Sequence, residues 1–464
     1  MSAPETAFRP PAPIPRSPIA ALLASLFARD RDLLTLLPEQ AYRTRIERLG
    51  RSRRGIVLVN DPASVREVMV DRVDAFAKND LFTGALAPLV GDGVFIAHGA
   101  DWQRQRAMIE PGFEHLRAGR SFAPMRAATE AFVARLHEKA GAPVRLDAEL
   151  SRLTADIIHR VIFSGPLDGS DAEALFADFA RFQAEVANVR VMQLLLGRPF
   201  APVEQPERAR AAATAIRSRL SAMIEARRAS GEEKGDLLGA ALAARDDEGR
   251  QFSPRELVDQ MAVFLLAGHE TTASTLTWLF LILSQRPHLA ADLRAEAERC
   301  MGEGAAEFGA LRQMTRMRAA LQETLRLYPP GAFLPRVALH DTRLGDIALR
   351  RGTMVLISPW IIHRHRELWR APDDFIPERF GPDAPRPVAG SYLPFGLGPR
   401  GCIGGAFAMA EAQLVAASVL RRFDIVIDRA AAVRPAVHLT LRPRDPVTVR
   451  FMPRRPPDSA RNGQ

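Results

Sequence analysis

Cysteine is scarce in this chain, and hydrophobic runs long enough to span a membrane are absent. Cys300 and Cys402 are the two cysteines among 464 residues, which excludes a disulfide framework and fits a reducing cytoplasm. The apolar run at residues 19–28 is much shorter than the roughly 18–20 residues that a membrane span needs. It also lacks a basic start and a convincing cleavage site, so we expect a soluble protein with no membrane span.

Lysine is also rare, because nearly all the positive residues behind the formal net charge of +9 are arginine. These arginines are scattered rather than clustered, and no basic motif interleaved with aromatic residues is present. We therefore do not expect nucleic acid as a partner. A basic face that docks an acidic protein partner is the better interpretation.

The apolar pattern predicts a mainly α-helical chain with small β-sheets. We expect helices at 62–71, 100–110, 120–140, 147–163, 171–195, 206–229, 255–284, 287–301 and 315–327. Short strands are expected at 55–60, within 336–349, at 423–427 and at 447–451. No repeat or separating linker is present, so we predict one domain over residues 36–452. A flexible, proline-rich lead-in with a short helix (1–35) would precede it, and a disordered tail (453–464) would follow.

The longest predicted helix begins at a capping box formed by Ser253 and Glu256, with Pro254 at the first helical position. At 1.5 Å per residue, the stretch 255–284 would be about 45 Å long. It is apolar nearly all round, and His269 with Glu270 interrupts the apolar run. We therefore expect a buried central helix.

Two stretches are rich in proline and glycine. Residues 76–98 are predicted to form a long functional loop, because Gly84, Pro88, Gly91 and Gly93 interrupt any regular pattern. The second stretch, near residues 199–206, separates two amphipathic helices by three prolines. It is interpreted equally well as a lid hinge or as a plain surface turn.

The stretch from Phe395 to Gly405 is the most informative part of the sequence. Five glycines and a proline surround Cys402, and a helical pattern begins immediately afterwards. Exposed amides in the loop and the positive end of the helix are expected to lower the pKa of the Cys402 thiol and favour the metal-binding thiolate. Arg400 is placed to pair with an anion beside a bound group. The alternative is a glycine-rich turn around a buried cysteine.

The pattern Phe-x-x-Gly-x-Arg-x-Cys-x-Gly, filled by Phe395, Gly398, Arg400, Cys402 and Gly404, resembles the haem-binding signature of the cytochrome P-450 family, here of the soluble bacterial type. The resemblance implies a mainly α fold with haem b between the central helix and the helix after the cysteine loop. Cys402 would be the axial thiolate ligand of the iron. Covalent c-type attachment is excluded, because no Cys-x-x-Cys-His occurs.

In the middle of the central helix, Gly268, Thr271 and Thr272 weaken the helix, and Glu270 needs a partner if it is buried. Such local violations often mark function. The stretch 267–272 resembles the family's Ala-Gly-x-Glu-Thr-Thr motif, which implies proton delivery by Glu270 and Thr271. The structural alternative is a glutamate tied to a neighbouring arginine, with threonines bonded to the preceding turn.

Glu323 and Arg326 stand three residues apart and so share one helical face. Alone, they would be read as a surface ion pair. Their context and the later Pro-Glu-Arg-Phe around Arg379 resemble the family's Glu-x-x-Arg helix and its meander arginine. The resemblance implies a buried structural triad beside the haem.

His98, Trp102 and Arg106 are spaced by four residues, which places them on one face if the helix reaches His98. The family uses Trp-x-x-x-Arg to hold a haem propionate, which implies this role for Trp102 and Arg106. His98 is expected at or just before the helix. Arg336 resembles another propionate arginine, and Phe395 and Arg400 complete the expected cofactor-binding residues. For each side chain the alternative is ordinary packing or solvation.

Taken together, these motifs predict a cytoplasmic haem-thiolate monooxygenase that uses O2 on an apolar small molecule. A separate ferredoxin or flavodoxin-type donor would supply electrons, because the chain is too short for a fused flavin reductase. The alternatives are a peroxide-using or rearranging family member, or a haem-binding sensor without turnover. An apolar substrate pocket is expected to be lined by Val263, Leu266, Ala267, Ala332 and Phe333.

Overall fold

A computed structural model describes residues 8–15, 17, 33–49, 54–117, 119, 121–167, 169–186, 197–302, 306–437 and 439–454. The short helix expected within the lead-in and residues 455–464 of the expected tail lie outside the described residues. Residues 187–195, the predicted end of the helix at 171–195, do so as well.

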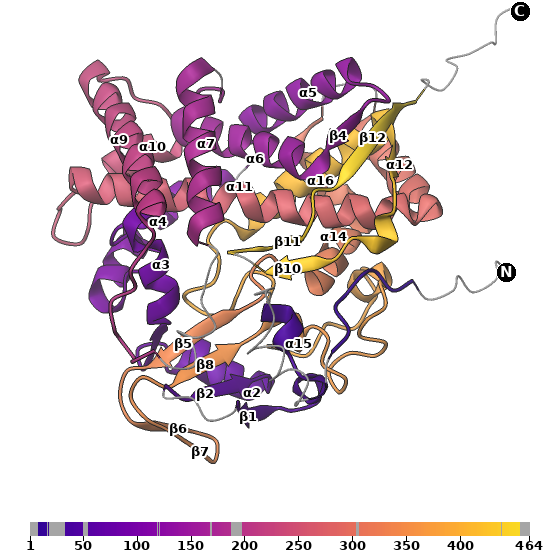
Figure 1. Cartoon of the computed structure of the whole chain (residues 1–464). Helices are drawn as coiled ribbons and strands as arrows, with labels where there is room; N and C mark the ends of the chain where they lie inside the picture. Colours follow the sequence, from indigo (N-terminus) through magenta and orange to yellow (C-terminus); the bar gives the residue numbers. More distant parts are fainter. Residues whose placement is uncertain are drawn as a thin grey trace, which may run out of the picture.

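Helix α11 (Pro254–Ser284) is the central element of the fold (Figure 1). The predicted capping box is present, since the Ser253 side chain accepts from the Glu256 N–H and the Glu256 side chain accepts from the Ser253 N–H. Residues on all sides of the helix are buried, as expected. Helix α6 (Leu146–Phe163) packs closely on α11 at Gly268. A Cβ at this glycine would lie 2.6 Å from the Ile158 side chain, so a larger residue would not fit.

The other long helices surround α11 close to the predicted positions. They are α4 (Gly99–Arg117), α5 (Phe122–Glu138), α7 (Gly169–Val186), α9 (Glu207–Ser230), α12 (Pro287–Met301), α14 (Thr315–Leu327) and α16 (Gly405–Arg422). Helix α4 continues through Pro111 and is longer than predicted. Figure 1 shows α7 and α9 on one side of α11 and the larger sheet on the other.

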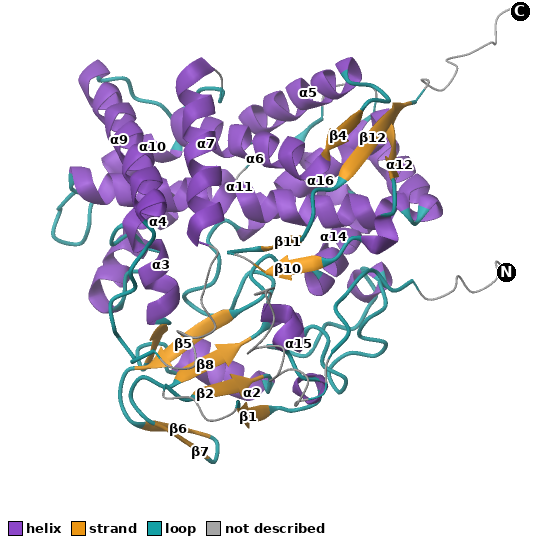
Figure 2. Cartoon of the chain, viewed as in Figure 1, coloured by secondary structure: helices purple, strands orange, loops and turns teal. Residues whose placement is uncertain are grey.

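The strands form small sheets, which lie mostly to one side of the helices (Figure 2). The largest has the order β1-β2-β8-β5-β3, in which β2 and β8 pair in parallel and the other pairs are antiparallel. Its strands are β1 (Ile46–Arg48), β2 (Ile56–Val59), β8 (Met354–Ile357), β5 (Leu334–Ala338) and β3 (Phe76–Lys78). The smaller sheets comprise β4 (Pro143–Arg145) with β12 (Thr448–Pro453) and β9 (Phe423–Ile427), β10 (Pro435–Val437) with β11 (Leu441–Pro443), and β6 (Thr342–Leu344) with β7 (Ile347–Leu349).

The prediction of a loop over residues 76–98 is wrong for its first half. Residues Phe76–Lys78 form β3, and α3 (Asp80–Val90) follows, started by the side chain of Asn79 accepting from the Leu81 N–H. Pro88 lies inside this helix, so its presence was a poor reason to expect a loop. Only the 92–98 segment, before α4, is irregular or turn-like.

Several short elements were not predicted, because they have too few residues to show a period. Helical ones are α10 (Leu237–Ala243), α13 (Phe308–Gln313) and α15 (Pro359–Ile362). The helix that was expected at 62–71 exists as α2 (Pro62–Arg66), continued by the π-helical η3 (Glu67–Asp71), so its winding changes in the second half. Short 3-10 turns are η1 (Leu33–Leu36), η2 (Glu39–Tyr42), η4 (Pro377–Phe380) and η5 (Ala430–Ala432).

Part of the lead-in is docked on the body, which differs from the flexible segment that we expected. The Arg9 guanidinium pairs with Asp374 at 2.6 Å, and the carbonyl of Phe8 accepts from the Phe375 N–H at 2.9 Å. The Tyr328 hydroxyl donates to the Pro11 carbonyl at 2.6 Å. Residues 8–15 therefore contact the region that leads to the cysteine loop.

None of the helices in the described part of the chain has both the length and the hydrophobicity that crossing a bilayer requires.

Candidate active site

The loop that carries Cys402 is fixed by its own backbone. The Cys402 N–H donates to the Phe395 carbonyl at 2.8 Å, and the Gly401 N–H donates to the Gly398 carbonyl at 2.9 Å. Gly398 has a φ of +71°, and a Cβ there would lie 2.5 Å from the carbonyl oxygen of Met69. Only glycine fits at such a position, because it tolerates both the left-handed backbone and the close approach. The loop therefore presents one sulfur just before α16 begins.

Small exposed side chains in otherwise buried elements mark a face between α11 and α16. Cys402 and Ala406 are exposed at the start of α16, and Ala267 is exposed in the middle of the buried helix α11. Thr271 lies one turn after Ala267, and its hydroxyl donates to the Ala267 carbonyl at 2.9 Å. This face is uncovered by the described protein residues although it lies deep within the fold.

A cluster of cations borders the same region. Arg400 donates to the Ala97 carbonyl at 2.8 Å, its Nη2 lies 3.3 Å from His98 Nδ1, and its guanidinium carbon lies 4.4 Å from the ring centre of Trp102. Arg106 donates to the Gly401 carbonyl at 3.1 Å. His98 precedes α4 rather than belonging to it. The expected cofactor-binding residues Trp102, Arg106, His98 and Arg400 thus meet beside the cysteine loop.

Arg336 and Lys78 complete this cluster from the larger sheet. They are direct cross-strand partners on β5 and β3, so their side chains lie on the same face. Burial, with the nearby charge of Arg400, lowers the pKa of Arg336 to about 10, and its Nε is buried without a hydrogen-bond partner. Lys78 was not recognised in the sequence, because a single lysine in a short strand carries no motif.

The expected direction of the Cys402 pKa is wrong for the protein chain alone. Burial raises the pKa of this thiol, and the Gly404 N–H, Arg106 and Lys78 oppose that rise without overcoming it. The thiol is crowded by protein on most sides, although one side remains exposed. The loop therefore supplies part of the stabilisation that a thiolate needs, and a metal cation would have to supply the rest.

Glu323, Arg326 and Arg379 form the expected triad, in which Glu323 and Arg326 are buried and Arg379 is partly buried. Arg326 donates to both oxygens of Glu323, at 2.7 and 2.8 Å, and Arg379 donates to Glu323 at 3.3 Å. The remaining N–H groups of Arg326 donate to the carbonyls of residues 363, 372 and 374, at 2.6–2.9 Å. Glu323 and Arg326 have no exposed side-chain surface, so the pair holds the irregular region that precedes Cys402.

The glycine loop with its accessible sulfur, the exposed Ala267 of α11 and the Glu323–Arg326–Arg379 triad all occur in one fold. The family model for cytochrome P450 matches residues 18–451. The chain belongs to the cytochrome P450 family. A cytokinin hydroxylase of Arabidopsis thaliana is 30% identical over 390 residues, covering 82% of this chain and 75% of that protein. Cyclooctatin synthase of Streptomyces melanosporofaciens is 33% identical over 364 residues, covering 76% and 77%.

Solved structures agree with this assignment. The crystal structure of cytochrome P450DA heme domain superposes with a TM-score of 0.82 at 26% identity, covering 97% of this chain and 99% of that one. The predicted mainly α fold is thereby confirmed. The protein is a cytochrome P450 monooxygenase with a thiolate-ligated haem, and it works with O2, an organic substrate and a redox partner.

The residues around Cys402 fit a haem. A thiol suits iron, and the uncovered face between α11 and α16 would accept a flat group. Haem carboxylates would meet Arg106, Arg336, Arg400 and Lys78, whose charges the described carboxylates balance only in part. The orphaned Nε of Arg336 is the clearest sign that an anionic acceptor belongs there.

Glu270 is not turned toward Thr271, as a simple acid–alcohol pair would be. Gln183 of α7 donates to one oxygen of Glu270 at 2.8 Å, and Arg442 of β11 lies 3.6 Å from the other. Thr271 bonds to its own helix instead. Gln183 and Arg442 were missed, because no sequence pattern links them to residue 270. The partner arginine and the bond from Thr271 to the preceding turn are both features that the structural alternative anticipated.

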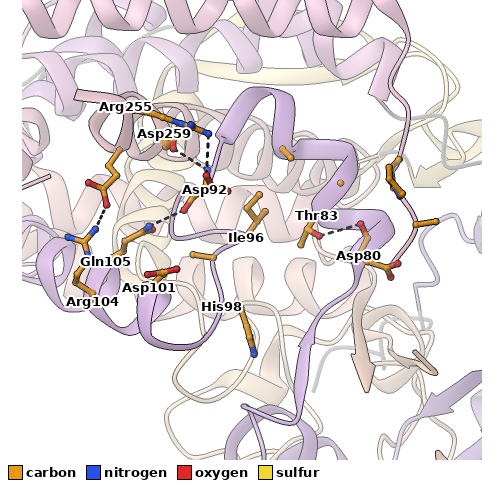
Figure 3. A pocket seen from close by; sticks show the side chains of 17 residues that line it. Asp80, Thr83, Asp92, Ile96, His98, Asp101, Arg104, Gln105, Arg255 and Asp259 are labelled. Atoms are coloured by element: carbon orange, nitrogen blue, oxygen red, sulfur yellow. Dashed lines mark hydrogen bonds and ion pairs between the residues drawn. The ribbon is translucent and has the colours of Figure 1, made fainter. Parts of the chain in front are cut away.

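The predicted pocket residues differ in exposure. Val263, Leu266 and Ala332 are buried, Phe333 is half-buried, and Ala267 is exposed. Figure 3 shows a different cavity of about 680 Å3 between α3, α4, residues 201–203 and the start of α11. Its polar lining includes Arg104, Asp92 and Asp259, and His98 is the single predicted site residue that lines it. We therefore do not identify it with the predicted substrate pocket.

His363 provides a pH-dependent test of the framework under the site. Its Nδ1 donates to the Arg326 carbonyl at 3.0 Å, and its Nε2 accepts from the Leu393 N–H at 2.7 Å, so the ring must be neutral. Burial lowers the pKa of His363 from 6.5 to about 3. Stability from this neutral ring is complete above the unfolded pKa and falls as the pH drops from 6.5 toward 3, because the unfolded chain takes up the proton.

We expect the wild type to lose about 2 kcal/mol more stability than His363→Gln between pH 7.5 and pH 5, because glutamine keeps a donor and an acceptor without titrating. Urea unfolding at both pH values measures this. His340→Gln, at an exposed histidine, should behave as the wild type. Equal pH dependence in wild type and His363→Gln would contradict the assignment.

Cys402→Ser should abolish the red-shifted absorption band of the reduced carbonyl complex, because the band requires thiolate ligation. Cys300→Ser should leave the band intact, since Cys300 belongs to α12 and packs against the main core. Retention of the band in Cys402→Ser would show that another residue holds the iron.

Proposed function

We propose that Cys402 is the axial ligand and that Trp102, Arg106, His98, Arg336 and Arg400 hold the haem carboxylates in an O2-dependent monooxygenase. Bound haem supplies the oxygen activation. The observation that carries the proposal is the accessible sulfur of Cys402 just before α16, together with the exposed Ala267 of the buried helix α11. Phe395 supports the loop, since its carbonyl accepts from Cys402 and its ring lies against Gly405.

Glu270 and Thr271 are proposed to supply protons. The Thr271 hydroxyl, bonded to the Ala267 carbonyl, lies on the uncovered face and can hold a water there. Glu270 is reached from solvent by way of Arg442, whose side chain is 38% exposed. A carboxylate in this place can carry protons from the surface toward Thr271, provided that it leaves Gln183 and Arg442 in turn. Proton supply is thereby separated from the apolar space that would hold the substrate.

The proposed substrate is an apolar small molecule, lying against Val263, Leu266, Ala267, Ala332 and Phe333. These side chains present no charge. The similar proteins include a pentalenene oxygenase of Streptomyces avermitilis and a cyclooctat-9-en-7-ol 5-monooxygenase of Streptomyces melanosporofaciens, each named for one organic compound. Their names support an organic compound as the substrate.

The electron donor is proposed to be a separate ferredoxin or flavodoxin-type protein, and the location to be the cytoplasm. The net charge of +9 supports docking of an acidic carrier. Scarcity of cysteine supports a reducing compartment. The single catalytic domain over residues 36–452 remains a prediction.

Thr271→Ala should leave haem binding, substrate binding and reduction in place but lower the product formed per NAD(P)H consumed, with more hydrogen peroxide released. Glu270→Gln should slow turnover and increase the solvent isotope effect, because an amide cannot carry a proton as a carboxylate can. The assay uses a reconstituted redox partner and a substrate found by shifts of the haem absorption band. Unchanged coupling and rate in both variants would reduce the two residues to packing features of α11.

A further inference from the structure

Lysine occurs only at positions 78, 139 and 234, in a chain that uses arginine almost everywhere else. Lys139 and Lys234 have side chains that are 46% and 33% exposed and pair with glutamates. Lys78 instead lies beside the cofactor face, where burial lowers its pKa well below the ordinary value. No described carboxylate forms a hydrogen bond or ion pair with it. Lys78 therefore differs from the other two lysines, because it is buried and has no carboxylate partner among the described residues.

Lys78 contacts the 92–98 segment at one residue, Phe95. Its ammonium donates to the Phe95 carbonyl and lies 3.6 Å from the centre of the Phe95 ring. The ring also meets Phe82, with centroids 5.8 Å apart. Lysine suits this place because its compact ammonium has three donors, which can serve a carbonyl, a ring face and a further acceptor together.

The 92–98 segment lies between α11 and the cysteine loop. The Val94 N–H donates to Gln260 of α11 at 3.1 Å, and a Cβ at Gly93 would lie 2.9 Å from Val263. At the other end, Arg400 of the cysteine loop donates to the Ala97 carbonyl. Phe95 thus lies in a segment held between the two elements that flank the proposed haem, two residues after Gly93, which approaches the predicted pocket residue Val263.

Two other cations lie near the Lys78 ammonium. Arg336 is its cross-strand partner, and the charge of Arg400 also acts on it. Like charges directly opposite each other on a sheet are unfavourable. An anionic group placed between these side chains would relieve the repulsion, and a haem carboxylate is the anion that the site is proposed to receive. Lys78 would then contact the cofactor and Phe95 at once.

We propose that Lys78 is a positioning residue that links the haem edge to Phe95, so that the bound cofactor fixes the aromatic wall of the ligand cavity and limits the size of the ligands admitted. The inference rests on the proposed haem position. Lys78 would thus influence ligand size through its contact with Phe95, without contacting the ligand itself. Without Lys78, Phe95 keeps its contact with Phe82 and loses its connection to the cofactor.

The test compares azole binding to the haem-loaded protein, followed by the shift of its absorption band. Imidazole is the small probe, and an imidazole carrying a triphenylmethyl group is the large one. Lys78→Met should increase affinity for the large probe about tenfold while imidazole affinity stays within about twofold. Phe95→Ala should give the same selective increase. Lys139→Met is the matched control, and its two affinities should equal those of the wild type.

The double variant Lys78→Met/Phe95→Ala decides whether the residues act as one unit. We expect no increase beyond that of Phe95→Ala alone, because the lysine acts through this ring. Fully multiplicative increases, or an unchanged ratio of large to small affinity in Lys78→Met, would overturn the inference. Lys78→Met should also transfer haem to apomyoglobin faster than Lys139→Met, a readout that needs no turnover, and equal rates would contradict contact with the cofactor.

Should Lys78→Met fail to load haem, Lys78→Gln replaces it. Glutamine keeps donors for the carbonyl and the carboxylate but loses the charge, so a smaller selective increase is expected and an unchanged ratio overturns the inference. Failure of the proposed function has a different appearance: the wild type itself would show no azole shift. A wild type that responds to both azoles, with an unaltered ratio in the variants, leaves the proposed function standing and the inference refuted.

Discussion

The buried pair of Glu323 and Arg326 is the interaction on which the active-site framework depends. Every N–H of the guanidinium is used, and three of its acceptors are backbone carbonyls between residues 363 and 374. That region has little regular structure, so its backbone groups need partners from elsewhere. Arg326 supplies them, and His363 passes the constraint on to Leu393, two residues before the cysteine loop. A pair that gains little as an isolated ion pair thereby fixes the position of one sulfur.

Positive charge beside the cofactor face is only partly balanced by the described chain. Burial lowers the pKa values of Lys78, Arg336 and Arg400; the charge of Arg400 lowers those of Lys78 and Arg336 further, and Asp74 acts on Arg400 in the opposite direction. The raised pKa of Cys402 has a related origin, because burial of the thiol outweighs the donors around it. Both imbalances would decrease if an anionic porphyrin with a cationic iron bound here as proposed. Haem binding would then also stabilise the fold.

The sequence revealed those parts of the site whose chemistry is concentrated in short motifs. Three such features could be predicted, because each depends on neighbours within a few residues. They are Cys402 with its glycines, the Glu323–Arg326 spacing and the long helix with the Ser253 cap. Residues 76–90 were misread, since Pro88 and Gly84 suggested a loop while the Asn79 cap decided for a helix. Gln183, Arg442 and Lys78 were not found, because their roles arise from contacts across 87 to 258 residues of sequence. No local pattern records such a contact.

Glu270 shows how tertiary structure resolves a conflict that local sequence creates. A carboxylate inside an apolar helix is unfavourable unless it is paired, and the neighbouring Gly268 and Thr271 weaken the helix further. Thr271 satisfies its hydroxyl on the Ala267 carbonyl, while Gln183 and Arg442 satisfy the carboxylate from two other elements. Because these partners belong to α7 and β11, the place of Glu270 depends on how both elements pack on α11. A change in either one would therefore alter the carboxylate's distance from Thr271, so the proposed proton route through Glu270 depends on the packing of α7 and β11.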